Sequence, residues 1–335
     1  MNGRKKWLII GVILISLGAI LILGVAIMND FNLGGGKYET NTYTITEDVG
    51  SIVINSSTAD ITVLQSEDGE CRVVCFEKKN LKHAVGCEGG ELKIDLFDSR
   101  RWYEHISFGT KQTKITVYLP KVQYDSLKIK ESTGDIHISK GLSFASADLS
   151  LSTGDVECYA SATDTLSVKT STGDIKCEDI SVGRLKLTAT TGDITVGGVE
   201  AESIDASVST GRVTVTEASV LGDVSVKVST GRARLESVRC KSLYSVGSTG
   251  SLTLVDVIGS EEFSIKRSTG DVSFDGCDAG RITISTDTGD VRGSLLSEKI
   301  FDVDTDTGSK SLPNTSSGGV CKITTDTGDV RITIK

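Results

Sequence analysis

The sequence predicts an all-β fold, a single-stranded parallel β-solenoid with coils of about 19 residues and two main strands in each coil. A Thr-Gly pair recurs along the chain, and successive glycines are 19 or 20 residues apart. Apolar residues alternate with polar ones on both sides of every pair. The repeated glycines are Gly134, Gly154, Gly173, Gly192, Gly211, Gly231, Gly250, Gly270, Gly289, Gly308 and Gly328. A period held this closely is typical of stacked units that each contact only their neighbours.

The alternation predicts strands. Around Gly134, apolar residues stand at Leu127 and Ile129 before the glycine and at Ile136 and Ile138 after it. A spacing of two residues places such side chains on one face of a strand. A unit of about 19 residues is too short to hold a crossover helix between two strands, because that connection needs a dozen residues or more. Each coil is therefore expected to run strand, corner, strand and a short connector.

The glycines are interpreted as structural corners. A sharp change of direction favours a residue that tolerates positive φ, and glycine does so without a Cβ clash. The residue that follows is Asp in seven of the eleven copies, and a carboxylate there can accept hydrogen bonds from exposed turn amides. The Thr-Gly pair is thus expected to shape the scaffold rather than to bind a ligand.

An apolar segment near the N-terminus predicts a membrane anchor. Trp7 to Met28 form 22 residues without a charge, long enough to span a bilayer as a helix. Arg4, Lys5 and Lys6 precede the segment and Asp30 follows it. This asymmetry favours a cytoplasmic N-terminus and an extracytoplasmic remainder. A cleaved signal peptide is the alternative, but its apolar region is normally shorter and no small-x-small site stands before Asp30.

Five segments follow from these patterns, and the lipid bilayer is one predicted partner. They are a basic cytoplasmic tail at 1–6, a transmembrane signal-anchor helix at 7–28, a flexible linker at 29–43, irregular N-terminal capping coils at 44–126 and the regular repeats at 127–335. Within the capping segment, Ser57-Thr58-Ala59-Asp60-Ile61 looks like a decayed corner in which Ala59 replaces the glycine. Terminal repeats are often atypical in this way.

The run from Val117 to Lys121, followed by Leu127-Lys128-Ile129 and Ser132-Thr133-Gly134-Asp135-Ile136, resembles the "putative adhesin" family of bacterial β-strand-repeat proteins. The resemblance covers about residues 40 to 335. It implies a membrane-anchored, extracytoplasmic β-solenoid of the cell envelope, with links to envelope stress in some members. It supplies no catalytic residues.

Acidic residues at the C-terminal corners suggest two kinds of chemistry. The Asp-Thr-Gly triplets that begin at Asp287, Asp306 and Asp326 match the triplet of aspartic proteases. Those enzymes need two carboxylates facing each other, whereas these triplets are copies of one corner stacked along one edge. Together with Asp290 and Asp329 they are weak candidates for calcium ligands. Solvated carboxylates are the simpler interpretation, because the dense Asp-Gly turns of calcium-binding solenoids are missing.

Cysteine and histidine give a second candidate site. Cys71, Cys75, His83 and Cys87 have the residue types of a zinc site, but about 13 Å of strand separates the first two cysteines. Cys158 and Cys177 each follow their corner glycine by four residues, so they are expected to stack inward as small apolar side chains. Eight cysteines without regular pairing suggest a reducing habitat for an exported chain.

One aromatic cluster, around Trp102 and Tyr103, falls in an expected loop of the capping segment. Such a loop could contact a partner or cover the open end of the solenoid. The two interpretations remain open.

The leading functional hypothesis is a non-enzymatic envelope protein that presents a rigid rod to a protein or cell-wall partner, or carries an envelope stress signal. No cofactor is expected, and the net charge of −9 argues against nucleic acid. A carbohydrate-acting β-helix enzyme is the alternative, although the repeats show no obvious cluster of acid and base groups. Self-assembly is a further alternative, because Arg331 to Lys335 would leave an uncapped strand edge.

Overall fold

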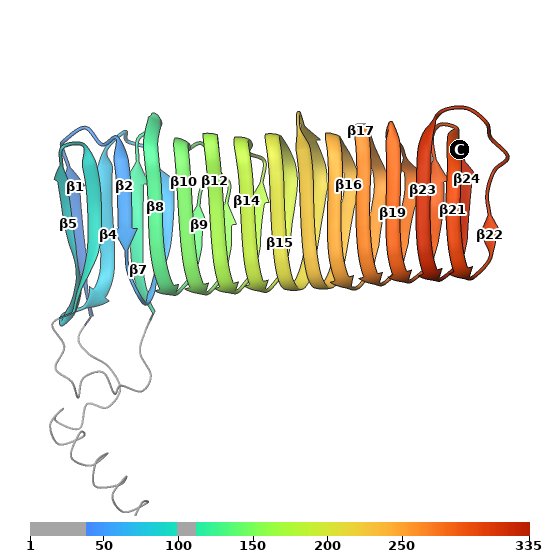
Figure 1. Cartoon of the computed structure of the whole chain (residues 1–335). Helices are drawn as coiled ribbons and strands as arrows, with labels where there is room; N and C mark the ends of the chain where they lie inside the picture. The colour runs from blue at the N-terminus through green and yellow to red at the C-terminus, as the bar shows by residue number, and fades with distance from the viewer. Residues whose placement is uncertain (1–37, 99–111) are drawn as a thin grey trace, which may run out of the picture.

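The computed structural model describes residues 38–98 and 112–335, and in these ranges the chain is all-β. The strands stack side by side into a straight rod, with the N-terminal strands at one end and the C-terminal strands at the other (Figure 1). The predicted parallel β-solenoid is thereby confirmed. The described part of the chain contains no helix that is long and apolar enough to span a membrane. The predicted anchor at 7–28 lies outside the described residues.

Every strand belongs to one hydrogen-bonded sheet that winds around the rod. The strands of the N-terminal half are β1 (Tyr38–Ile45), β2 (Ser51–Asn55), β3 (Ala59–Gln65), β4 (Cys71–Lys78), β5 (Leu81–Glu88), β6 (Glu91–Asp98), β7 (Thr113–Leu119), β8 (Gln123–Thr133), β9 (Ile136–Ile138), β10 (Ser143–Thr153), β11 (Val156–Cys158), β12 (Ser161–Thr172), β13 (Ile175–Glu178) and β14 (Ser181–Thr191). Those of the C-terminal half are β15 (Ile194–Val220), β16 (Asp223–Thr249), β17 (Leu252–Thr269), β18 (Val272–Cys277), β19 (Arg281–Thr288), β20 (Val291–Leu295), β21 (Lys299–Thr307), β22 (Lys310–Ser311), β23 (Gly319–Thr327) and β24 (Val330–Ile334).

The core is a continuous column of apolar side chains between the faces of the rod. The alternating residues predicted to point inward are buried, as Leu127, Ile129, Ile136 and Ile138 show with exposures of 1% or less. In the parallel register each of them faces its equivalent on the next coil. Cys158 lies directly opposite Cys177, and both are buried, as predicted.

The corner glycines are required for two reasons. All eleven have positive φ, between 123° and 158°. They also stack so closely that a Cβ on one would lie 1.6–2.3 Å from a backbone carbonyl oxygen of the neighbouring coil. Ala59 occupies the same column beside Gly134, which confirms that Ser57 to Ile61 is a modified corner.

A second corner was not predicted. Six residues after several of the glycines, the chain adopts positive φ again, for example at Asp179, Glu217 and Ser237 with φ of 52–55°. Gly198 and Gly276 take the same place in other coils. These positions share the left-handed backbone conformation but no residue type, so the sequence carries no repeated residue that would identify this corner.

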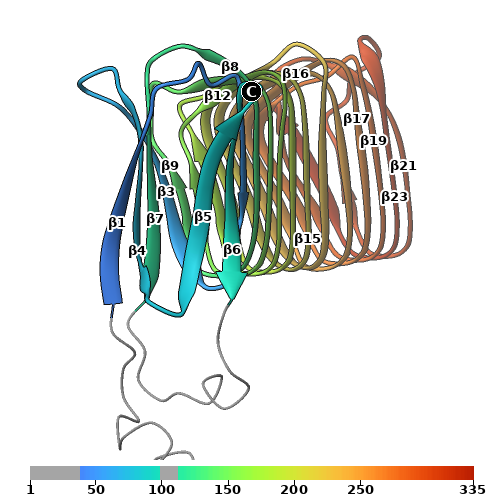
Figure 2. The same ribbon diagram turned by 90° about the vertical axis from the view of Figure 1, so that its left-hand side faces the viewer.

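At the N-terminal end the order of coils in space differs from their order in the chain. The coil β2–β3 lies between β6–β7 on one side and β8–β9 on the other, with parallel pairing throughout. Beyond it, β4 pairs antiparallel with β1 and β7, and β5 pairs antiparallel with β6. Figure 2 shows these antiparallel strands at the near end of the rod.

The C-terminal end is also out of order, so the edge predicted to be open at Arg331 to Lys335 is covered in part. The last coil, β23–β24, is inserted between β19–β20 and β21–β22. Val330 and Arg331 are thereby covered by a strand on both sides, whereas Ile332 to Ile334 pair only with β20 among the described residues. Arg331 pairs with Asp329 at 2.9 Å and Lys335 pairs with Asp275 at 2.6 Å.

The sequence of the displaced coil explains its terminal place. Lys310 stands two residues after its glycine, where the other coils carry a buried apolar residue, and β22 is only two residues long. The Lys310 ammonium instead reaches the carbonyl of Val303, at 2.8 Å. A coil with one incomplete face is best tolerated at the end of the stack, where only one side needs a neighbour.

Candidate functional site

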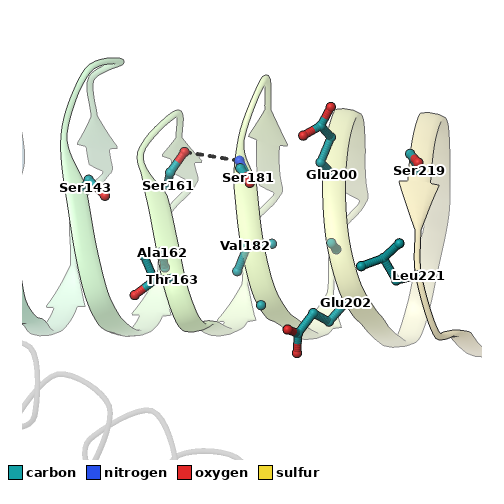
Figure 3. Close-up of a pocket in the computed structure, with 12 residues that line it drawn as sticks. Ser143, Ser161, Ala162, Thr163, Ser181, Val182, Glu200, Glu202, Ser219 and Leu221 are labelled. Carbon is teal, nitrogen blue, oxygen red and sulfur yellow. Dashed lines mark hydrogen bonds between the residues drawn. The ribbon is translucent and has the colours of Figure 1, made fainter.

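A groove crosses the coils from β10 to β15 (Figure 3). We call it the connector groove, because it follows the connectors that precede the long strands. Its volume is about 540 Å³, and it is lined by Ser143, Ser161, Ala162, Thr163, Ser181, Val182, Gly183, Glu200, Ala201, Glu202, Ser219 and Leu221. Equivalent positions on successive coils repeat at roughly the 4.8 Å spacing of paired strands. The groove therefore presents similar groups at regular intervals along the rod.

The connector groove has a mixed polar and apolar lining that is mildly acidic. Small side chains such as Ala162 and Ser181 form much of the lining, while Glu200 and Glu202 add two carboxylates. The Ser161 hydroxyl accepts a hydrogen bond from the amide of Ser181, at 3.1 Å. Leu221 stands at one end and is 82% exposed. Such a surface can accept an extended ligand with hydrogen-bonding or cationic groups.

A buried polar cluster lies at the N-terminal end of the rod. The Glu77 carboxylate accepts hydrogen bonds from Asn41 Nδ2, at 2.7 Å, and from the His83 backbone amide, at 2.7 Å. It also lies 2.8 Å from His83 Nδ1. The other ring nitrogen of His83 lies 3.0 Å from Ser56 Oγ. The cluster joins β1, β4, β5 and the corner after β2. The Ser–His–carboxylate order is also that of an activated nucleophile, but here every bond has a structural purpose, because it satisfies a buried polar group.

Within the described residues, the same cluster contains three side chains that are close enough together to bind one metal ion. Cys75, Glu77 and His83 are all buried, and each offers a ligand atom within 4.8 Å of the others. A thiolate, a carboxylate and an imidazole would suit zinc. Of the cysteines and histidine proposed from the sequence, Cys75 and His83 are thus brought together, and Glu77 was missed. Glu77 could not be recognised because nothing in the alternation of β4 distinguishes it as a ligand.

Glu77 makes the cluster sensitive to acid. Burial opposes its ionisation, but hydrogen bonds from His83 and Asn41 outweigh this effect, so the pKa of Glu77 falls below its ordinary value of 4.5. A carboxyl group with a lowered folded-state pKa contributes stability above its unfolded pKa, and this contribution is lost as the pH falls through the folded value.

We therefore expect the stability of the protein to fall on acidification below about pH 4.5. Glu77→Gln should cost about 1–3 kcal/mol at pH 7, because the charge-assisted bonds to His83 and Asn41 are weakened. Urea unfolding at pH 7 and pH 3.5 measures both effects. The difference between wild type and variant should shrink at the lower pH, and an unchanged difference would contradict the role of the carboxylate.

The Asp residues that follow the corner glycines form a hydrogen-bonded ladder. The Asp135 carboxylate accepts the amide of Asp155 at 2.9 Å, and Asp155 accepts that of Asp174 at 2.7 Å. The calcium candidates Asp290 and Asp329 belong to this ladder. Asp290 accepts the Asp329 amide and Asp329 accepts the Ser309 amide, while Arg292 and Arg331 pair with their remaining oxygens.

The other calcium candidates, Asp287, Asp306 and Asp326, are exposed and occupy equivalent positions on three neighbouring coils. Calcium binding by these five residues stays a prediction. Trp102 and Tyr103 lie outside the described residues, so their role as a partner contact or a cap also stays a prediction.

All eight cysteines are free, and seven of them are buried. Burial raises the pKa of the Cys321 thiol to about 12 and that of Cys158 to about 11. Because the thiolate is the reactive form, these side chains behave as inert apolar residues at neutral pH. The half-buried exception is Cys87.

The free edge at the C-terminal end is β21, which pairs only with β23. Its exposed residues include Asp302, Asp304 and Asp306, alternating with the half-buried Phe301 and Val303. Charged side chains on an edge strand oppose pairing with a second copy. On β24 the side that faces β22 is covered only at Val330 and Arg331, so self-assembly through Arg331 to Lys335 stays a prediction, while the neighbouring edge of β21 is acidic.

The fold and its ladders define a β-solenoid repeat protein. More particularly, the profile of the family described as Toastrack DUF4097 matches residues 49–239 and 213–335, and the chain belongs to this family. The match confirms the family resemblance noted in the sequence. None of the curated proteins compared with the chain matches it.

Several solved structures are similar to the chain. A "putative lipid binding protein" from Parabacteroides distasonis is 16% identical, with a TM-score of 0.43, and the match covers 77% of this chain and 98% of that one. A "putative adhesin" from Bacteroides fragilis is 14% identical, with a TM-score of 0.35 and coverage of 89% and 97%. A third, a "putative adhesin" from Parabacteroides merdae, is 15% identical, with a TM-score of 0.38 and coverage of 77% and 98%. At these identities and scores, the matches say nothing of what the present chain binds.

Proposed function

We propose that the protein is a non-enzymatic scaffold of the cell envelope, anchored by residues 7–28, whose solenoid lies outside the membrane and binds an extended partner. The observation that carries this proposal is the connector groove. It crosses several coils, with the hydroxyl groups of Ser143, Ser161 and Ser181 on successive coils and the carboxylates of Glu200 and Glu202 on the next coil. A strand of protein or a cell-wall polymer laid along the rod would meet hydroxyl groups repeatedly, at roughly the 4.8 Å spacing of paired strands.

The anchoring part of the proposal rests on the sequence. The uncharged segment 7–28 follows Arg4, Lys5 and Lys6, which favours a cytoplasmic N-terminus. Residues 38–43 of the predicted linker belong to β1, which pairs with β4, so the linker is proposed for 29–37 only. A rigid rod beyond it would hold the groove away from the bilayer surface. A role in transmitting envelope stress would follow if occupancy of the groove were sensed across the membrane.

The alternative of a carbohydrate-acting enzyme is less well supported. Glycoside hydrolysis uses a pair of carboxyl groups flanking the scissile bond. Glu200 and Glu202 line the groove, but they lie two residues apart on one coil, and none of the other lining residues carries an acid or a base. Purified protein is expected to release no sugar from cell-wall polymers, and measured release would reverse the preference.

The buried cysteines make the topology easy to test. In a Cys87→Ser background, the remaining seven cysteines are buried, so a single Asp306→Cys substitution supplies one exposed thiol. We expect a membrane-impermeant maleimide to label this thiol in intact cells, because the solenoid is proposed to lie outside. The background without Asp306→Cys is the control. Labelling only after cell lysis would contradict the proposal.

A further inference from the structure

Among the described residues, one arginine is buried inside the rod, in a column that otherwise holds mostly aliphatic and threonine side chains. Arg267 lies on β17, three residues before Gly270, and is only 2% exposed. The equivalent positions of other coils carry residues such as Leu151, Ala189 and Val208, all buried. A guanidinium group in such surroundings is costly unless a counter-charge accompanies it.

The coil on one side of Arg267 is shaped to admit the guanidinium. Gly247 faces Arg267 in the strand register, and a Cβ at Gly247 would lie 1.7 Å from Arg267 Nη1. The buried Ser245 hydroxyl accepts a hydrogen bond from Arg267 Nη2, at 2.7 Å. These contacts position the group but leave its charge without a partner. In the described ranges 38–98 and 112–335, no carboxylate forms an ion pair with Arg267.

Two polar atoms without a hydrogen-bond partner lie on the other side of Arg267, toward β19. Arg267 Nε is buried without a hydrogen-bond partner in the described part of the chain, and so is Thr286 Oγ1. Thr286 faces Arg267 directly in the register of β17 and β19, and it is also 2% exposed. Two unsatisfied donors on opposed residues indicate that something else accepts from both.

Other threonines in the same column behave differently. Thr170, Thr305 and Thr325 each donate to the carbonyl of a corner glycine on the neighbouring coil, at 3.4, 3.0 and 3.3 Å. Thr286 makes no such bond, although it stands at the same place in its coil. Its hydroxyl is therefore available beside the uncompensated charge.

We propose that Arg267 and Thr286 form an internal binding site for a small monovalent anion of halide size. The anion accepts hydrogen bonds from Arg267 Nε and Thr286 Oγ1 and neutralises the guanidinium. Burial lowers the pKa of Arg267 to about 10, so the side chain remains protonated at neutral pH and retains its need for a counter-ion. A water molecule could satisfy the two donors but not the charge.

The test compares thermal unfolding of the purified full-length chain, in non-ionic detergent, in sodium chloride and in sodium gluconate at equal ionic strength. Because the anion binds the folded state, the Tm in chloride should rise by about 1–3 °C for each tenfold increase in concentration above the dissociation constant. Arg267→Met should abolish this dependence, and Thr286→Val should weaken it. Thr170→Val is the matched control, since it removes a hydroxyl from the same column but leaves the site intact.

Two further outcomes decide the proposal. Equal Tm values for wild type in both salts would overturn it and indicate a water molecule or an empty site. A chloride dependence that persists unchanged in Thr286→Val and Arg267→Met would also overturn it, because the effect would then come from the protein surface. If Arg267→Met does not fold, Thr286→Val compared with Thr170→Val gives the answer.

Discussion

Replacing Gly211 with alanine is expected to destabilise the rod by about 3 kcal/mol or more. Gly211 has a φ of 147°, and a Cβ there would lie 1.9 Å from the carbonyl oxygen of Gly192. That oxygen belongs to the backbone of the neighbouring coil, so it cannot rotate away as a side chain would. The coils would have to separate at the corner, which would break the backbone hydrogen bonds that join them there, such as that from the Gly192 amide to the Thr210 carbonyl.

Urea unfolding followed by circular dichroism measures this loss. Gly86→Ala is the matched control, because its added Cβ meets no atom within 4 Å and its φ is not positive. The control should change stability by no more than about 0.5 kcal/mol. A similar small change for Gly211→Ala would contradict the interpretation of the glycines as obligatory corners.

The second large effect concerns the inserted C-terminal coil. Val330 on β24 is fully buried between β20 and β22, whereas Val303 on β21 is only half-buried at the end of the rod. Val330→Ala should therefore cost about 2–3 kcal/mol, from lost burial and the cavity left behind. Val303→Ala should cost about 1 kcal/mol or less.

The two valine variants distinguish the order of the coils. If the coils stacked in chain order, Val330 would lie at the open end and Val303 would be covered on both sides. The larger loss would then belong to Val303→Ala. Since repeat proteins can unfold coil by coil, amide hydrogen exchange of β21 and β24 should accompany the denaturation curves.

Much of the fold could be predicted because each coil repeats the same physical solution. The corner glycines, the inward columns and the stacked Cys158 and Cys177 all follow from the 19-residue period. The replacement of glycine by Ala59 was also visible, because the residues around it kept the pattern.

The order of the end coils was not predicted, since a period gives the form of each coil but not its place in the stack. Lys310 was the one available signal, as a charge at a position that is apolar in the other coils. The second corner was not predicted because Asp179, Glu217 and Ser237 share no residue type.

The sites were harder to predict than the fold. Glu77, His83 and Ser56 come from three separate elements, and only the antiparallel end of the rod brings them together. In the sequence, Arg267 is a charged residue three positions before a corner glycine, and nothing there indicates that it is buried. Its burial became apparent only from the register that places Gly247 opposite it. Such contacts depend on which coils are neighbours, and single-coil patterns do not contain that information.

The central claim is that the connector groove holds an extended partner outside the membrane. Photo-crosslinking amino acids at Thr163 and at Leu221 in intact cells test it most directly, with Lys169 as the control on the same strand as Thr163 but outside the groove. We predict that both groove positions capture the same partner, because one ligand crosses several coils, and that Lys169 does not. Equal capture at Lys169, or different products at the two groove positions, would contradict the claim.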